Sequence, residues 1–425
     1  MKLRLFFLSF FALSSLANGQ DMNFIKKSIG VLSGPGFGGR GYVSNSREKG
    51  ARFIYRNFTE IGLNSFSEDG NYYQEYVFDV NTFPNKVELK LGKKQLQPGI
   101  DFLVDAASSG YQTTGKNKME RINLAKIKDS AEWQKQKSQF NAHDIYQLKN
   151  VDTFCKRMKI RSSALMQELP KGCYIVPQTN KLTWTVSTKT MPATVFYVSD
   201  TSMPKGKKVE VNVQNKLLSS ALSKNVIGFI PGSHFPDSFI VFTAHYDHLG
   251  KMGAKAIFPG ANDNASGSAF NLGLAKYFKE HQQKYSIVFI AFSGEEAGLL
   301  GSSHFVEKPV FPLSQIKLLI NIDLMGDASD GITVVNAVQQ KSVFDDLQAI
   351  NSRKKLLPKI ASRDNAPNSD HYPFTQAGVP AIFIYANGGK GHYHDVFDKP
   401  KELSLNNVSK VFQLLTDFVS KKSGL

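Results

Sequence analysis

Cysteine is scarce in this chain, and that scarcity narrows the chemistry the sequence supports. Only two of the 425 residues are cysteines, Cys155 and Cys173, and neither falls in a segment rich in histidine and carboxylate residues. A catalytic thiol is therefore not expected. In an oxidising compartment the two would pair and close a loop worth roughly 3 kcal/mol in the chain-entropy model. We expect this bridge, with two free or buried thiols as the alternative.

Long hydrophobic runs are also scarce. After residue 20 no apolar stretch is long enough for a membrane helix. One short run, residues 5–16, follows a basic start with Lys2 and Arg4 and precedes the small residues at 17–19. This is the pattern of a secretory signal peptide. We predict that residues 1–19 are cleaved and that the protein is secreted or periplasmic, with no cysteine at the cut site to carry a lipid anchor.

Acidic residues are in the minority, with 36 aspartates and glutamates against 52 lysines and arginines and a net charge of +16. Residues 86–215 carry 22 basic and 11 acidic residues, hence +11 of that excess. Such a field would favour anionic surfaces or acidic peptides, but we prefer a solvated basic face that aids solubility. No nucleic-acid partner is expected, because no binding module is recognised. The glycine-rich residues 34–39 follow a helical pattern and not a strand, which argues against a phosphate loop.

Four short apolar runs each lead to residue types that bind metals or transfer protons. They are residues 239–244 before His245-Tyr246-Asp247, 287–290 before Glu295-Glu296, 318–320 before Asp323, and 379–384 before His392-Tyr393-His394. Such runs, bounded by turn residues, are typical of strands buried on both faces of an α/β sheet. Ligands bind such sheets beyond the carboxyl ends of the strands. The four segments are therefore expected to converge.

Asp263 is a fifth candidate, in Gly260-Ala261-Asn262-Asp263-Asn264 before a helical pattern. An isolated aspartate there would normally be a helix N-cap. Together with the other four segments, however, it makes a set of two histidines and three carboxylates that suits zinc and exceeds the needs of one catalytic ion. Shared between two ions with one bridging carboxylate, the set forms a co-catalytic centre and leaves Glu295 as a general base.

The ordered motifs resemble those of a known enzyme family. They are His245-Tyr246-Asp247, Asn262-Asp263-Asn264-Ala265-Ser266-Gly267, Ser293-Gly294-Glu295-Glu296-Ala297-Gly298, Asn321-Ile322-Asp323-Leu324-Met325-Gly326, Ser369-Asp370-His371, and Tyr393-His394 with Asp398. This set resembles the di-zinc metallopeptidases of family twenty-eight, which include secreted bacterial aminopeptidases and glutamate carboxypeptidase. The resemblance covers residues 235–400 and, weakly, Gly38-Gly39-Arg40-Gly41.

The resemblance implies a role for each position. His245 and Asp323 would bind one zinc, Glu296 and His394 the other, and Asp263 would bridge the two. Asp247 would orient His245 from behind, Glu295 would shuttle the proton, and Tyr393 would donate a hydrogen bond to the scissile carbonyl or its oxyanion. The Asp263-Asn264 peptide bond is predicted to be cis.

Three further histidines are given lesser roles. His392 is an alternative ligand to His394, but the spacing to Asp398 favours His394. His248 is expected at the surface or outside the ligand set. His371 adjoins Ser369 and Asp370, and three adjacent residues cannot face one another as a catalytic triad. Asp370 either lines the substrate pocket or caps a helix.

The remaining patterns define domains. Residues 20–85 are assigned to the first part of the catalytic domain, with a helix over 46–62 that a capping box of Asn45 and Glu48 begins and Gly62 ends, followed by a strand over 73–80. Residues 86–215 are predicted to form a smaller β-rich insertion, similar in place to a protease-associated domain. Residues 216–425 complete an α/β domain with a mixed, mostly parallel sheet and helices on both faces.

These expectations combine into one function. We expect an exported zinc-dependent exopeptidase, namely an aminopeptidase that hydrolyses N-terminal peptide bonds through a metal-bound water activated by Glu295. The alternatives are a carboxypeptidase or dipeptidase of the same fold, a single-zinc glutaminyl cyclase, and a receptor-like protein without catalysis. The zinc content would separate them: two equivalents for a peptidase, one for the cyclase and none for a receptor.

Overall fold

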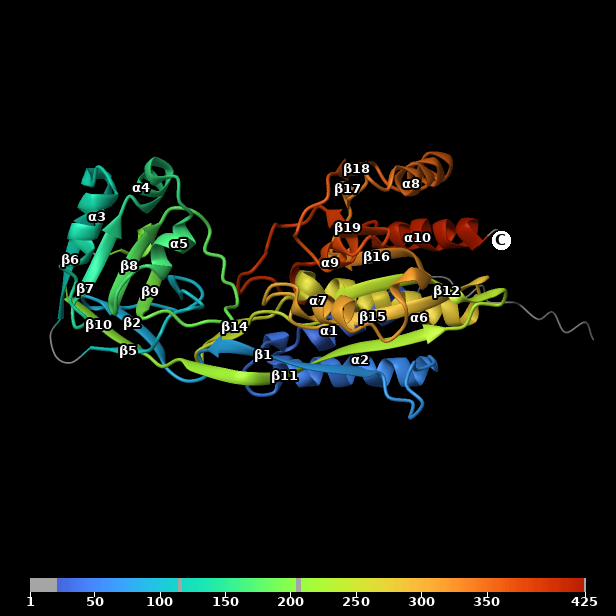
Figure 1. The fold of residues 1–425 in the computed structure, drawn as a ribbon, viewed down its shortest axis with the longest axis horizontal. Helices are drawn as coiled ribbons and strands as arrows, with labels where there is room; N and C mark the ends of the chain where they lie inside the picture. Colours follow the sequence, from blue (N-terminus) through green and yellow to red (C-terminus); the bar gives the residue numbers. More distant parts are fainter. Residues whose placement is uncertain (1–20, 114–116, 204–207, 424–425) are drawn as a thin grey trace, which may run out of the picture.

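The computed structural model describes residues 21–113, 117–203 and 208–423. The predicted signal peptide, residues 1–19, lies outside this range. The chain forms a larger part with the central sheet and a smaller part built on a second sheet, and the long antiparallel pair β1 and β11 extends from one toward the other (Figure 1).

The central sheet has eight strands in the order β1-β11-β15-β12-β16-β19-β17-β18. In that order they are Tyr73–Thr82, Lys216–Ile230, Tyr285–Phe292, Phe235–His245, Ile316–Asp323, Ala381–Asn387, Gly331–Val335 and Ile360–Arg363. The four strands β15, β12, β16 and β19 run parallel, and antiparallel pairs lie on both sides of them. The predicted mixed, mostly parallel α/β fold is confirmed.

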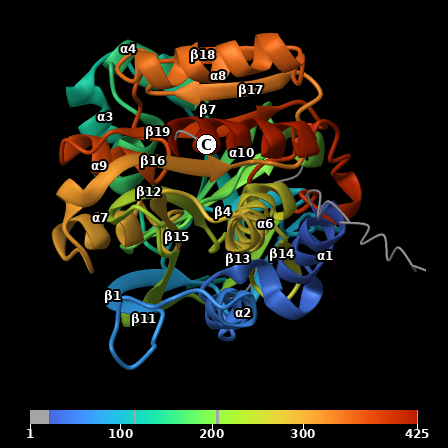
Figure 2. The same ribbon diagram turned by 90° about the vertical axis from the view of Figure 1, so that its right-hand side faces the viewer.

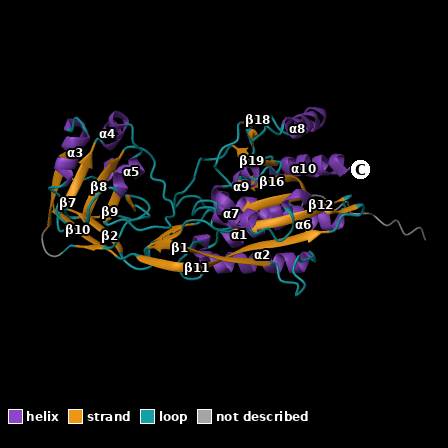
Figure 3. Ribbon diagram, in the orientation of Figure 1, coloured by secondary structure: helices purple, strands orange, loops and turns teal. Residues whose placement is uncertain are grey.

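Helices cover both faces of this sheet (Figures 2 and 3). On one face lie α1 Met22–Leu32, α2 Ser46–Ile61, α6 Gly267–Glu280, α8 Lys341–Lys354 and α10 Val408–Ser423. On the other lie α7 Leu300–Glu307 and α9 His371–Gln376. Alternate residues of the parallel strands serve the two cores: Phe242 packs with the first group and Val241 with the second. This explains why these strands read as continuous apolar runs.

The predicted N-terminal helix is α2, and its two ends differ in outcome. Gly62 ends it in a left-handed conformation with φ 78°, and its N–H donates to the carbonyls of Phe58 and Thr59. The predicted capping box is wrong, because Asn45 is itself left-handed and its side chain bonds no helix N–H. Glu48 instead pairs with Arg52 one turn along the helix. The strand predicted over 73–80 is β1.

The second sheet lies within the segment predicted as an insertion. Its strands are β2 Val87–Leu91, β3 Lys94–Gln95, β4 Phe102–Val104, β5 Tyr111–Gln112, β6 Asn117–Asn123, β7 Ile145–Lys149, β8 Gly172–Gln178, β9 Ala193–Ser199 and β10 Lys208–Val213. Helices α3 Ser130–Lys137, α4 Val151–Met158 and α5 Ser162–Gln167 pack on it. Strands β6 to β9 are parallel neighbours. A short hairpin, β13 Gly250–Met252 with β14 Ala256–Phe258, belongs to the catalytic segment but packs into the core of this part.

The predicted disulfide is wrong. Cys155 on α4 and Cys173 on β8 are free, buried, and in separate hydrophobic clusters. Burial raises the pKa of both thiols, so each behaves as a small apolar side chain and not as a reactive group.

Among the helices of the described residues, none has both the length and the hydrophobicity needed to cross a membrane.

Candidate functional site

The predicted ligand residues gather at one edge of the central sheet. His245 and Asp323 are the last residues of β12 and β16, Glu295 and Glu296 follow β15, and His394 follows β19. Asp263 lies in the irregular segment Ala261–Ser266 that leads into α6. Because the carboxyl ends of parallel neighbours meet at the same edge, all of these residues except Glu296 line one hollow of about 210 Å³, and Glu296 lies next to His394.

Asp263 occupies the middle of the group. Its Oδ1 lies 3.5 Å from Nε2 of His245, and its Oδ2 lies 3.1 Å from Nε2 of His394. On the first side, Oδ2 of Asp323 is 3.3 Å from the same nitrogen of His245. On the second, Oε2 of Glu296 is 3.1 Å from Nε2 of His394. The carboxylate of Asp263 therefore faces two separate His–carboxylate pairs.

This donor set suits two divalent cations. Imidazole nitrogen and carboxylate oxygen are the ligands that zinc takes in catalytic sites. The carboxylates of Asp263, Glu296 and Asp323 are all at least nine-tenths buried. Oδ1 of Asp323 has no hydrogen-bond partner among the described residues. Buried carboxylates are costly unless paired with cations, and ions between these pairs would supply the positive charge.

The two neighbouring glutamates differ in their electrostatics. Burial raises the pKa of Glu295 well above its ordinary value, Glu296 adds to the rise, and His245 opposes it. Burial acts on Glu296 in the same direction, but the imidazoles of His394 and His248 outweigh it and hold the pKa of that carboxyl well below its usual range. Glu295 is thus suited to take up a proton, and Glu296 to stay charged.

The backbone around Asp263 donates two hydrogen bonds to Asp398 and contains a cis peptide bond. The carboxylate of Asp398 accepts from the N–H of Asn262 at 2.8 Å and from the N–H of Asp263 at 3.0 Å. The bond between Asp263 and Asn264 is cis, and that prediction is confirmed. Asp398 therefore supports the segment that carries the central carboxylate.

Arg40 is a supporting residue that only a weak motif match, Gly38-Gly39-Arg40-Gly41, indicates in the sequence. Its side chain is fully buried, and burial lowers its pKa to about 10. It donates to five carbonyl oxygens, those of Leu32, Tyr246, Pro259, Gly260 and Asp263, at 2.7 to 3.2 Å. The guanidinium therefore joins Tyr246, the residue after His245, to residues 259–263, the segment that contains Asp263.

Asp247 lies behind His245, but its contacts differ from those expected. Nδ1 of His245 is 3.2 Å from the main-chain oxygen of Asp247 and 3.8 Å from its carboxylate, beyond hydrogen-bond distance. The carboxylate instead accepts from the hydroxyl of Tyr42 at 3.1 Å and the N–H of Glu295 at 3.3 Å. Asp247 therefore contacts the predicted ligand His245 through its backbone and the predicted base through its side chain.

The other histidines occupy distinct places. His248 is fully buried, with Nδ1 2.6 Å from Oε1 of Glu296, so it lies directly behind a predicted ligand. His392 faces Asp395 at 3.7 Å and is not part of the group. His371 is buried, and neither ring nitrogen has a partner among the described residues. Asp370 is also buried, and burial raises its pKa to about 7. It is not among the residues that line the hollow.

The loop that carries His394 is bound by the second part of the chain. Nδ1 of His394 lies 2.9 Å from the carbonyl oxygen of Trp184. The main-chain N–H of Trp184 in turn donates to the carbonyl of His394 at 2.9 Å. Lys181 pairs with the buried Asp395 at 2.6 Å. The preceding residue, Tyr393, stacks on His394 with ring centroids 3.9 Å apart and is 46% exposed at the hollow. Sequence reasoning missed Trp184 and Lys181, because no motif or spacing marks them.

Comparison with known proteins finds relatives of the segment that carries these residues. Residues 225–419 match the model of peptidase family M28. The chain is 30% identical over 206 residues to aminopeptidase YwaD of Bacillus subtilis, covering 47% of this chain and 44% of that protein. It is 31% identical over 231 residues to a glutamate carboxypeptidase 2 homolog of Caenorhabditis elegans, covering 46% and 29%. The aligned regions thus span less than half of these relatives.

Solved structures extend the likeness to nearly the whole chain. A zinc aminopeptidase from Bacillus subtilis superposes with a TM-score of 0.66 at 19% identity, over 94% of both chains. A peptidase M28 precursor from Shewanella amazonensis gives a TM-score of 0.68 at 14% identity, over 94% of this chain and 92% of that one. At these identities the likeness shows a shared fold.

Proposed function

The chain belongs to peptidase family M28 through residues 225–419, and we propose that it is an exported zinc exopeptidase that removes N-terminal residues from peptides. The observation that carries the proposal is the position of Asp263 between His245 and His394, with a buried glutamate of raised pKa beside them. That arrangement provides for metal binding and for proton transfer at one point.

Zinc is supported by the relatives, which include zinc metalloproteases, and by the donor set. We assign two ions: His245 and Asp323 would hold one, Glu296 and His394 would hold the other, and Asp263 would contribute to both. Bound zinc would supply Lewis acidity that makes a water nucleophilic at neutral pH and polarises the scissile carbonyl.

Glu295 is the proton carrier in this proposal. Its carboxylate lies 4.0 Å from Nε2 of His245, and its side chain is 14% exposed, so it reaches the hollow while remaining shielded from bulk water. A carboxylate of raised pKa accepts a proton from the attacking water more readily than an ordinary one. It can then deliver that proton to the leaving amine, which must be protonated for the peptide bond to break.

Tyr393 is assigned to the carbonyl oxygen of the substrate. It lies at the hollow, and burial and the surrounding carboxylates raise the pKa of its hydroxyl above the ordinary value. The hydroxyl therefore stays protonated and can donate a hydrogen bond as negative charge develops on that oxygen.

The choice of an aminopeptidase and the export of the protein rest on evidence from outside the site. The aminopeptidase preference is supported by YwaD, whereas the glutamate carboxypeptidase relative makes cleavage from the other end the main alternative. Export is proposed from the pattern of residues 1–19, which predicts a secretory signal peptide.

Matched peptides with free and blocked amines test the proposal. We expect only the free-amine peptide to be hydrolysed, with activity lost on chelation and near two equivalents of zinc in the active protein. Glu295→Gln should retain both metals and lose about 10²–10⁴-fold in kcat, whereas Glu307→Gln, on the exposed end of α7, should behave as wild type. Equal cleavage of blocked and free peptides refutes the aminopeptidase assignment. Full activity in Glu295→Gln refutes the role of that glutamate.

A further inference from the structure

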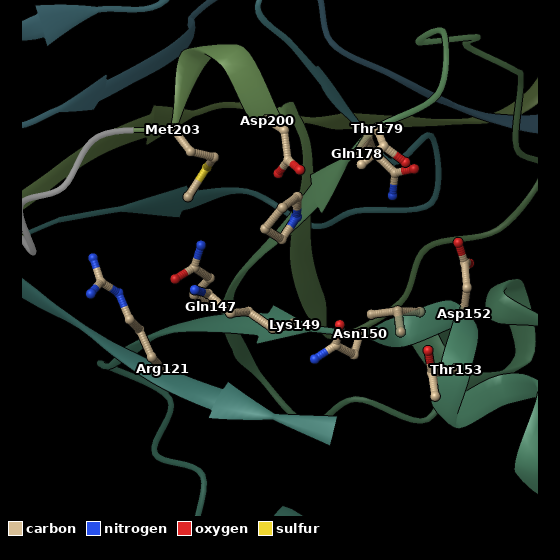
Figure 4. Close-up of a pocket in the computed structure, with 12 residues that line it drawn as sticks. Arg121, Gln147, Lys149, Asn150, Asp152, Thr153, Gln178, Thr179, Asp200 and Met203 are labelled. Atoms are coloured by element: carbon tan, nitrogen blue, oxygen red, sulfur yellow. The ribbon is translucent and has the colours of Figure 1, made fainter. Parts of the chain in front are cut away.

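A second hollow lies at the edge of the second sheet, away from the histidines and carboxylates of the candidate metal site. It has a volume of about 570 Å³ and is formed where β6, β7 and β8 end (Figure 4). These three strands are parallel neighbours, so the hollow stands beyond their carboxyl ends, the place where open α/β sheets bind ligands. Its size is within the range of about 300–1,000 Å³ usual for small-molecule sites.

The buried side chain of Gln147 on β7 indicates that this hollow is a binding site. Its side chain projects from the strand into the hollow (Figure 4), although the residue is only 4% exposed. Its Oε1 has no hydrogen-bond partner among the described residues. A buried amide oxygen without a partner is unfavourable, because it has lost its hydrogen bonds to water. A ligand that donates a hydrogen bond at this point would recover that free energy.

One end of the hollow suits a carboxylate. The turn from β7 into α4 consists of the single residue Asn150, so the first turn of this eight-residue helix opens directly onto the hollow through Val151, Asp152 and Thr153. The side chain of Asn150 does not cap the helix, since it donates to Asn123 instead. Unbonded N–H groups at a helix start attract anions. Lys149, the last residue of β7, lines the hollow beside them.

The charged side chains that line the hollow restrict the kind of anion that can bind there. Arg121 and Lys149 line the hollow, but so do two carboxylates, those of Asp152 and Asp200. Asp200 lies across the hollow from Lys149 and Asn150 in Figure 4. A polyanion such as phosphate would be repelled by Asp200 and by Asp152 in the first turn of α4. A molecule with one negative and one positive end brings only one negative charge to that turn, where Lys149 and the helix N–H groups oppose Asp152, and its positive end faces Asp200.

We propose that this hollow binds a free α-amino acid. The carboxylate lies against the start of α4 and Lys149, and the ammonium group donates to Oε1 of Gln147 and to Asp200. The peptide hydrolysis proposed above would release such molecules, but binding here uses none of the residues assigned to that reaction and does not depend on it.

Calorimetric titration of the zinc-loaded full chain tests the site. The Glu295→Gln chain is used so that no turnover occurs, and an alkyl hydroxamate fills the metal centre beforehand. The probes are leucine, lysine and glutamate, then leucinamide, which lacks the carboxylate, N-acetylleucine, which lacks the ammonium, and inorganic phosphate. The site variants Gln147→Leu and Asp200→Asn are each compared with Lys135→Gln, an exposed change on α3 outside the hollow. Circular dichroism checks that each variant is folded.

At least one of the free amino acids should bind, and both site variants should weaken its binding at least tenfold while Lys135→Gln leaves it unchanged. When leucine binds, leucinamide and N-acetylleucine should each bind at least tenfold more weakly. Absence of binding by all three amino acids overturns the proposal, as does unchanged binding in the folded site variants or phosphate binding as tightly as the amino acids. If Gln147→Leu does not fold, Asp200→Asn alone decides. Loss of peptidase activity in wild type would leave these outcomes unaffected, so failure of the two proposals can be told apart.

Discussion

Nδ1 of His394 lies 2.9 Å from the carbonyl oxygen of Trp184, a residue 210 positions earlier in the chain. A carbonyl only accepts, so this contact places a ring hydrogen on Nδ1 and turns Nε2 toward Asp263 and Glu296, where the ring would bind a metal ion once Nε2 is deprotonated. Partners of this kind fix the tautomer and orientation of metal-binding histidines. The smaller part of the chain, built on the second sheet, therefore helps to position His394 in the candidate metal site of the larger part.

Lys181→Met should weaken the hold on this histidine. Lys181 pairs with the buried carboxylate of Asp395 at 2.6 Å and donates to the carbonyl of Gly391 at 2.8 Å, on either side of His394. Without it, Asp395 is left buried without its cation and the loop loses its anchor. We expect the affinity for one zinc to fall about tenfold, within the range for outer-shell changes, measured by competition with a chelator. Lys189→Met, an exposed change in the same segment, is the control, and equal affinities in the two variants would refute this role.

His248→Leu should disturb the metal site from behind. Nδ1 of His248 lies 2.6 Å from Oε1 of Glu296 and helps to keep the pKa of that carboxyl low. Removing the imidazole should raise that pKa and lower zinc affinity by about 10- to 100-fold, with a steeper loss of metal as the pH falls. The comparison is His234→Leu, on the exposed loop before β12. Metal content that follows the same pH curve in both variants would show that His248 is only structural.

The sequence predicted those parts of the site that depend on strand ends. All the ligand segments except that of Asp263 follow an apolar run, and parallel strands bring their ends to one edge whatever the sequence between them. Arg40 and Trp184 act through contacts with residues more than 200 positions away, Pro259 and His394, which no spacing or periodicity reveals. The cysteine pairing failed for a related reason, because burial of Cys155 and Cys173 in separate clusters depends on tertiary packing. The capping box failed because the left-handed backbone of Asn45 turns its side chain away from the helix N–H groups.

Arg40→Lys should destabilise the fold although it keeps the charge. A lysine has one ammonium group and cannot reach the five carbonyl oxygens that the buried guanidinium joins. Carbonyls left without donors and a poorly solvated ammonium should lower the free energy of unfolding by about 3 kcal/mol or more, measured in urea. Arg52→Lys, on the exposed side of α2, should change it by less than about 0.5 kcal/mol. A similar small change in Arg40→Lys would contradict the anchoring role.

His371 should make stability fall in mild acid. Burial lowers its pKa from 6.5 to about 4 and outweighs the opposing effect of the Ser369 backbone. The unfolded chain therefore binds a proton at this position more readily than the folded one. Its contribution to stability is fully present above pH 6.5 and is lost progressively as the pH falls through 6.5 toward 4, in all about 3 kcal/mol. His371→Leu removes this titration, so the difference in unfolding free energy between wild type and variant should shift by that amount between pH 7 and pH 4, while the effects of other groups cancel. A difference that is constant with pH would show that the ring titrates equally in both states.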